Sequence, residues 1–122
     1  YQQFVAVLDR ATSLPDSTRK AQLSQHTTEP QLSKVLQVAA KHQKHKIASY
    51  GYSIVHIRDV QVRNGEAEVR DCQDSSKAGL RNSSTGKKLN RGVAQENVRA
   101  TLKKSADGRW RVSRYTVIGE GC

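Results

Sequence analysis

The apolar residues of this chain change their spacing near residue 49, and no other feature limits the possible folds as strongly. Before that point they recur every three or four positions, which is the period of an amphipathic helix. After it they alternate with polar residues and turn signals recur, which is typical of antiparallel strands. This order predicts an α+β fold, with three N-terminal helices packed on one side of a curved antiparallel sheet.

The first two helices are predicted before residue 27. A helical spacing joins four residues until the sequence SLPD ends the pattern: Tyr1, Phe4, Leu8 and Ala11. The following segment, residues 16–26, contains good helix formers but offers only Ala21 and Leu23 to a core. It is therefore predicted as a short second helix.

The third helix, within residues 27–47, has the clearest helical pattern. Thr28 and Gln31 have the spacing of a capping box, and Pro30 suits a first helical turn. Six apolar residues fall on one face: Leu32, Val35, Leu36, Ala39, Ala40 and Ile47.

The strongest hairpin signal is the Asn64-Gly65 pair, which favours a two-residue type I′ turn. That turn pairs residues 58–63 with 66–71, so that Arg58 would lie opposite Asp71. One face of these strands and of residues 50–56 is then largely apolar. A polar band formed by His56, Arg58 and Asp71 crosses it.

Two later turns are predicted, one near Gly86 and one at residues 106–108. A three-residue loop with Gly108 in the left-handed conformation pairs Leu102 with Val112 and Lys104 with Trp110. A two-residue loop would instead pair Leu102 with Ser113. The first register matches apolar with apolar residues and is the one we expect.

The length of 122 residues fits one domain, residues 1–122, since no linker, repeat or low-complexity tract divides the chain. There is no initiating Met, no apolar run of signal-peptide length and no membrane span. We expect a mature exported fragment whose signal or anchor lies upstream, and association with a membrane only through that anchor.

The formal charge is +10, and fourteen of the 21 Lys and Arg residues lie in residues 58–114. Such a field favours anionic partners, although a solvated basic surface explains the same composition. Nucleic acid is not the partner expected, because no aromatic-basic repeat, zinc spacing or helix-turn-helix is present. Five cations are candidate anion-binding residues: Lys41, Lys44, Lys46, Arg99 and Arg111.

The two cysteines, Cys72 and Cys122, indicate one disulfide and an oxidising compartment. Two unpaired thiols in a reducing compartment are the alternative. His42 and His45 lack a third ligand nearby, so no metal site is expected, and no motif for a cofactor occurs.

Several ordered motifs resemble a known superfamily. They are LPDSTRKAQLSQHTTEPQLSKVL, VRDCQDSSKAGL, STGKKL, VRATLKKSADGRWRV and VIGEGC. Together they span nearly the whole chain, which is similar to NTF2-like (SnoaL-like) proteins and, more narrowly, to small exported actinobacterial members of unknown function. The resemblance implies a cone of helices and curved sheet around one pocket, and a secreted or cell-envelope location behind a signal peptide or lipid anchor.

The hypothesis that follows is a non-catalytic domain that binds a small ligand, a protein or an anionic envelope polymer through its cone and basic rim. The predicted pocket residues are Tyr50, Tyr52, His56, Arg58, Asp71, Arg114 and Tyr115. The alternative is an isomerase- or dehydratase-like enzyme that uses Asp71 or His56 with Tyr50 or Tyr52 for proton transfer. An Arg58–Asp71 pair would weaken that carboxylate as a base. A third possibility is a purely structural accessory module that forms a homodimer through the outer face of the sheet.

Overall fold

The computed structural model describes all 122 residues and has three α-helices, one 3₁₀ turn and six strands. The helical elements are α1 (Gln2–Arg10), η1 (Ala11–Ser13), α2 (Asp16–His26) and α3 (Gln31–Lys44). The strands are β1 (Ile47–Gly51), β2 (Ile57–Arg63), β3 (Glu66–Gln73), β4 (Ala78–Asn82), β5 (Glu96–Lys104) and β6 (Trp110–Glu120). None of the helices has the length and apolar character needed to cross a membrane.

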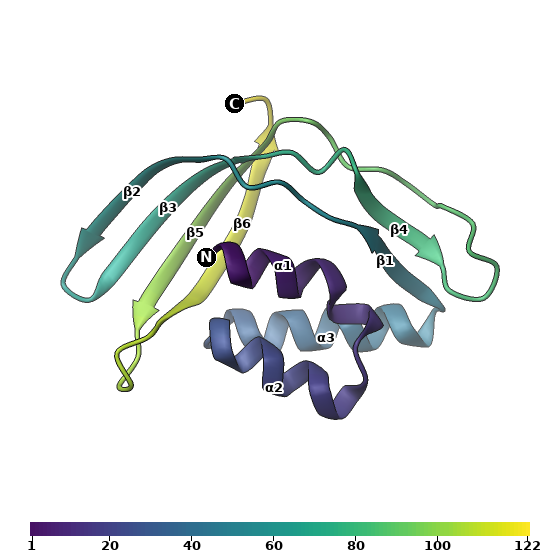
Figure 1. The fold of residues 1–122 in the computed structure, drawn as a ribbon, viewed down its shortest axis with the longest axis horizontal. Coiled ribbons are helices and arrows are strands. Elements are labelled where there is room, and N and C mark those ends of the chain that lie inside the picture. The colour runs from purple at the N-terminus through teal and green to yellow at the C-terminus, as the bar shows by residue number, and fades with distance from the viewer.

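The strands form two antiparallel sheets rather than one continuous meander. The larger sheet has the order β2-β3-β5-β6, and β1 pairs only with β4. Figure 1 shows both sheets arching over the helices, the larger sheet at one end and the β1–β4 ribbon at the other. The α+β class and the packing of N-terminal helices on antiparallel sheet are therefore confirmed.

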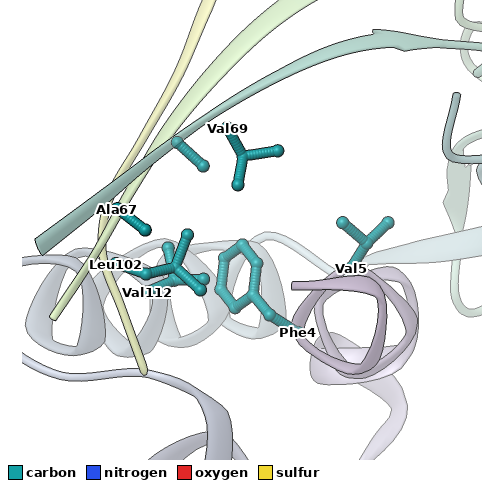
Figure 2. Packing of buried hydrophobic residues seen from close by; sticks show 7 residues of the cluster. Phe4, Val5, Ala67, Val69, Leu102 and Val112 are labelled. Atoms are coloured by element: carbon teal, nitrogen blue, oxygen red, sulfur yellow. The ribbon is translucent and has the colours of Figure 1, made fainter. Parts of the chain in front are cut away.

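The main core lies between α1 and the larger sheet. Phe4 and Val5 on α1 pack against inward residues of β3, β5 and β6, as Figure 2 shows. The ring of Phe4 also meets that of Tyr115 edge to face, with centroids 5.4 Å apart. A second buried cluster joins the helices to one another: Val7, Ala11, Leu23 and Val35. Ala21, which the sequence offered to the core, is exposed.

The β2–β3 hairpin confirms the predicted turn but corrects part of the predicted register. Residues 59–63 pair with 66–70 as expected, and Asn64 and Gly65 both have positive φ. A bulge at Arg58 then shifts the ladder, so that Ile57 rather than Arg58 lies opposite Asp71. The expected Arg58–Asp71 pair is wrong for that reason.

The β5–β6 hairpin has the register preferred from the sequence: Leu102 pairs with Val112 and Lys104 with Trp110. Gly108 has a φ of 83°, as the three-residue loop requires. The turn near Gly86 is present, and the chain returns along β4 through one antiparallel bridge between Arg81 and Lys88. The long partner of β4 is β1, on its other side.

The end of α3 also differs from the prediction. The helix stops at Lys44, and Ile47 begins β1 instead of adding to the apolar helix face. Lys46, at a φ of 55°, makes the turn between them. Strand β1 then ends at Gly51, which has a positive φ that favours glycine. The Lys77 carbonyl also lies so close that no side chain would fit there.

The predicted disulfide between Cys72 and Cys122 is present, with Cα atoms 5.7 Å apart. The bond joins Cys122, which follows β6, to Cys72 on β3. No free cysteine remains.

Candidate ligand-binding site

A cavity of about 450 Å³ lies between η1, α3 and the β1–β4 ribbon. Volumes of roughly 300–1,000 Å³ are usual for small-molecule sites. Its apolar wall is formed by Leu8, Ala11, Val35, Val38, Ala39 and Ala78. Its polar lining includes Thr12, Gln31, Lys34, His42, Ser49 and Tyr50.

Helix α3 supplies one complete side of the cavity. Val35, Val38, Ala39 and His42 share one face of the helix, because each lies three or four residues from another member of the set. Val35 and Ala39 are buried, whereas Val38 is 52% exposed. The apolar face of α3 therefore continues outward past the core and becomes the cavity wall.

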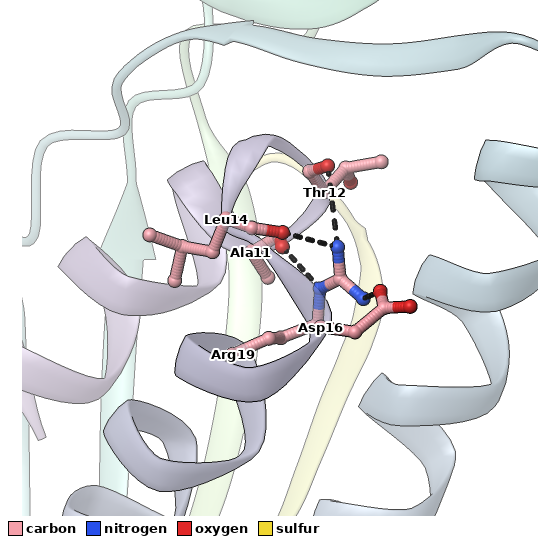
Figure 3. A network of polar contacts seen from close by, with 5 residues as sticks. All are labelled: Ala11, Thr12, Leu14, Asp16 and Arg19. Carbon is pink, nitrogen blue, oxygen red and sulfur yellow. Dashed lines mark hydrogen bonds and ion pairs between the residues drawn. The ribbon is translucent and has the colours of Figure 1, made fainter.

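Arg19 shapes the opposite side, although sequence reasoning gave it no role. Its side chain is buried, and Nε donates a 2.6 Å hydrogen bond to the Ala11 carbonyl. One terminal nitrogen donates to the Leu14 carbonyl at 2.5 Å and the other pairs with Asp16 at 2.8 Å (Figure 3). The guanidinium thus holds η1, whose Ala11 and Thr12 line the cavity.

The N-terminal end of α3 is tied to β6 by Gln31. Its Oε1 accepts a hydrogen bond from the backbone N–H of Tyr115 at 3.1 Å, so it does not form the predicted capping box. The Tyr115 hydroxyl in turn donates to Gln73 at 3.1 Å. Burial raises the pKa of Tyr115, so that phenol keeps its proton and serves as a donor.

Tyr50 forms part of the cavity wall on the ribbon side. Its hydroxyl donates a 2.6 Å hydrogen bond to the Asn90 carbonyl. The ammonium of Lys88 lies 4.8 Å from the ring centroid, within the range of a cation–π contact. Gly79 sits directly against this ring, and a Cβ there would approach the Tyr50 hydroxyl to 2.8 Å.

Asp9 is the one carboxylate that lines the cavity. It accepts hydrogen bonds from the backbone N–H of Ser53 at 2.8 Å and from its hydroxyl at 3.0 Å. Burial raises the pKa of Asp9, and the two bonds from Ser53 partly oppose that rise.

The part of the chain around the cavity is strongly basic. We call residues 31–51 and 75–95, which comprise α3, the β1–β4 ribbon and their loops, the basic lobe. It holds nine of the 21 Lys and Arg residues and none of the eleven acidic ones. Since twelve cations and eleven acids remain elsewhere, nearly all of the net charge of +10 belongs to this lobe.

Asp71 lies outside the cavity, in a buried polar network. Oδ2 accepts hydrogen bonds from the Tyr1 hydroxyl at 2.6 Å and the Gln73 amide at 2.9 Å. Oδ1 accepts one from the backbone N–H of His56 at 2.8 Å. The carboxylate is therefore fully engaged in joining the N-terminus, β3 and the bulged end of β2.

The predicted pocket residues are only partly brought together. Tyr50 and Tyr115 line the cavity, but Asp71, His56, Arg58 and Arg114 do not. His56 is exposed, and its Nδ1 lies 3.1 Å from the Cys72 carbonyl oxygen. Arg114 pairs with Thr101 and points away from the core, and Tyr52 borders a different cavity beside α1.

The four residues of the catalytic alternative, Asp71, His56, Tyr50 and Tyr52, thus do not share a site. The polar atoms of Asp71 and Tyr50 are bonded to protein groups, as described above. No group of three or more His, Cys, Asp and Glu side chains is arranged to hold a metal ion.

The predicted anion-binding residues separate into two sets. Lys41, Lys44 and Lys46 are exposed in the basic lobe. Arg99 lies 3.5 Å from Glu68 on the outer face of the larger sheet. Arg111 donates to both carboxylate oxygens of Asp107 and to the Ser24 carbonyl, so its guanidinium is occupied.

Comparisons with known proteins bear on the fold alone. No protein-family model matches the chain, and no curated protein does either. The crystal structure of the intermembrane space region of the chloroplast protein ARC6 is similar, with a TM-score of 0.73 and 14% identity over 98% of this chain and 91% of that one. A de novo designed β-sheet protein solved by NMR covers 100% of this chain and 92% of its own, at 17% identity, but with a TM-score of 0.40.

Proposed function

We propose that this domain is a binding protein for a small amphiphilic anion, a lipid-like molecule with an apolar body and an anionic head group. The observation that carries the proposal is an apolar cavity of about 450 Å³ that borders a lobe of nine cations and no acids, while Asp9, the one carboxylate in its lining, is already bonded to Ser53. Burial of the apolar body would supply most of the affinity, at about 25 cal/mol per Å². The basic lobe would supply attraction and orientation.

The orientation of the ligand follows from the lining. Lys34 and His42 lie on the exposed side of α3 at the edge of the apolar wall. Lys88 contacts the ring of Tyr50, which also lines the cavity. The head group would therefore remain at this rim, in contact with water and cations, while the apolar body lies along Val35, Val38 and Ala39.

We also propose that the domain is NTF2-like and works outside the cytoplasm. The Cys72–Cys122 disulfide supports an oxidising compartment, in which such bonds persist. A protein that works outside the cytoplasm and holds one lipid-like anion would have no need for a metal or a nucleophile in its cavity.

The test compares two probes of equal chain length, dodecanoate and dodecan-1-ol, by isothermal titration calorimetry. We expect dodecanoate to bind about fivefold more tightly, the effect of roughly 1 kcal/mol for an exposed ion pair, with the difference shrinking as salt is added. Val38→Trp should fill the cavity from its exposed side and abolish the binding of both probes.

Two charge variants separate the head-group contact from the general field. Lys34→Glu should weaken the binding of dodecanoate but not the binding of dodecan-1-ol. Lys20→Glu, on the exposed surface of α2 and outside the cavity lining, is the matched control and should change neither. Binding that persists unchanged in the Val38→Trp variant would refute the proposed site.

A further inference from the structure

Strand β2 is the outermost strand of the larger sheet, and nothing in the chain covers either its edge or its inner face. Val60 and Val62 pair with the buried residues Val69 and Ala67, so they lie on the core-facing side of the sheet. They are nevertheless 50% and 61% exposed. Figure 1 shows why: the β2–β3 hairpin extends away from the three helices.

The backbone groups on the open edge are those of the two valines. In an antiparallel sheet each residue directs its N–H and C=O to the same neighbouring strand, and successive residues alternate. The N–H of Lys104 on β5 donates to the Gly65 carbonyl, so the backbone groups of Gly65 face β5. By alternation, Glu66, Glu68 and Arg70 direct their backbone N–H and C=O groups toward β2. Their partners on β2 are Arg63, Gln61 and Asp59, and the backbone groups of these three residues face β3. The groups between them, on Val60 and Val62, are left without a partner in the sheet.

We propose that a second copy of this chain pairs with this edge, β2 against β2 in antiparallel orientation, about a twofold axis through Gln61. In this register Val60 of each copy lies opposite Val62 of the other. Each such pair can exchange both backbone hydrogen bonds, because these are the residues whose groups face outward. Their side chains meet on the inner face of a sheet that becomes continuous through both copies.

The same register also matches charge. Asp59 of each copy lies opposite Arg63 of the other, on the outer face of the sheet. Neither residue forms an ion pair within its own chain. An axis through Val60 would pair Val60 with itself but would place Asp59 opposite Gln61 and Val62 opposite Arg58, so the charges and one valine of each copy would be left unmatched.

This arrangement differs from a dimer formed through the outer face of the sheet. An outer-face dimer would cover Glu68, which already forms ion pairs with both Arg70 and Arg99. The β2 edge is the place where unpaired backbone groups, exposed apolar side chains and unmatched charges coincide. A closed, self-complementary interface of this kind produces a dimer and no larger assembly.

Charge exchange across the axis tests the proposal. The unmodified protein should show a concentration-dependent dimer by sedimentation velocity up to about 1 mM, the range of weak complexes. Arg63→Asp alone places carboxylates opposite each other at both ends of the junction, and Asp59→Arg alone does the same with guanidinium groups. Each variant should therefore be a monomer, with circular dichroism confirming that it is folded.

An equimolar mixture of the two variants should form a heterodimer, since every opposing pair is then oppositely charged. The double variant Asp59→Arg with Arg63→Asp should self-associate as the unmodified protein does. Arg99→Glu, on the outer face and away from the edge, is the control and should leave the dimer intact. A monomer at every concentration, or a dimer that Arg99→Glu disrupts and Arg63→Asp does not, would overturn the inference.

Discussion

The hydroxyl of Tyr1 donates a 2.6 Å hydrogen bond to Oδ2 of Asp71 and so fastens the first residue to β3. Burial raises the pKa of Tyr1, with the Asp71 bond adding to the effect, so the phenol stays protonated. Because Asp71 is buried and accepts three such bonds, its removal leaves several donors without an acceptor.

We expect Asp71→Ala to lower the free energy of unfolding by about 3 kcal/mol, the usual loss when a buried, charged acceptor is removed. Tyr1→Phe, which removes one of the three donors, should lower it by about 1 kcal/mol. Urea denaturation followed by circular dichroism measures both. Equal losses in the two variants would contradict the central place of the carboxylate.

Arg19 is expected to stabilise η1 far more than its ion pair suggests. Arg19→Met keeps the aliphatic bulk but removes the donors to the Ala11 and Leu14 carbonyls. It should lower the free energy of unfolding by about 2–4 kcal/mol. Asp16→Ala removes only an exposed partner and should cost less than about 1 kcal/mol. If the two costs in thermal denaturation prove similar, the surface ion pair and not the carbonyl contacts holds this turn.

The disulfide should make a large contribution to stability. Closing a separation of 50 residues is worth about 4 kcal/mol in the chain-entropy description. We therefore expect replacement of both Cys72 and Cys122 by Ala to lower the free energy of unfolding by about that amount in urea. Intact mass after alkylation supplies the direct check. The native oxidised protein should gain no adduct, and the reduced, unfolded protein should gain one on each cysteine.

Asp9 predicts a pH dependence with a definite sign. Its pKa in the folded protein is raised above the ordinary 3.8, so the native state holds the proton more tightly than the unfolded state does. The contribution of this group to stability is therefore greatest below pH 3.8 and falls as the pH rises through the raised pKa.

Asp9→Asn cannot titrate at this position, so it isolates that contribution. The unfolding free energy of the unmodified protein minus that of the variant should decrease as the pH rises through this window and then level off. Urea denaturation of both proteins across acidic pH measures the difference. A difference that grows with pH would show that the Ser53 hydrogen bonds outweigh the burial of the carboxylate.

The strand register could be predicted wherever a turn and an alternating pattern agreed. The Asn64-Gly65 turn and the Gly108 loop both placed their flanking pairs correctly. The bulge at Arg58 could not be predicted, because an extra residue in a strand leaves no mark on composition. That single residue moved Arg58 away from Asp71 and separated the polar band on which the predicted pocket depended.

The cavity itself had little local signal. It exists because β1 pairs with β4 across a long stretch of chain and leaves a space over α3. The apolar face of α3 was predicted, including Val35 and Ala39, but not that its outer part would lack a covering element. Arg19 was missed because a cation on a polar helix usually faces solvent. Helix α2 has few apolar residues, and Arg19 is buried along with Leu23 instead.

The bond between Cys72 and Cys122 also decides how the domain bears mechanical load. A pull on the end of β6 would otherwise peel that strand from β5 one hydrogen bond at a time. Through the disulfide the same pull enters at β3, which is hydrogen-bonded to a strand on each side. The tension is then shared by many bonds at once, and the sheet resists stretching from its C-terminal end as a unit.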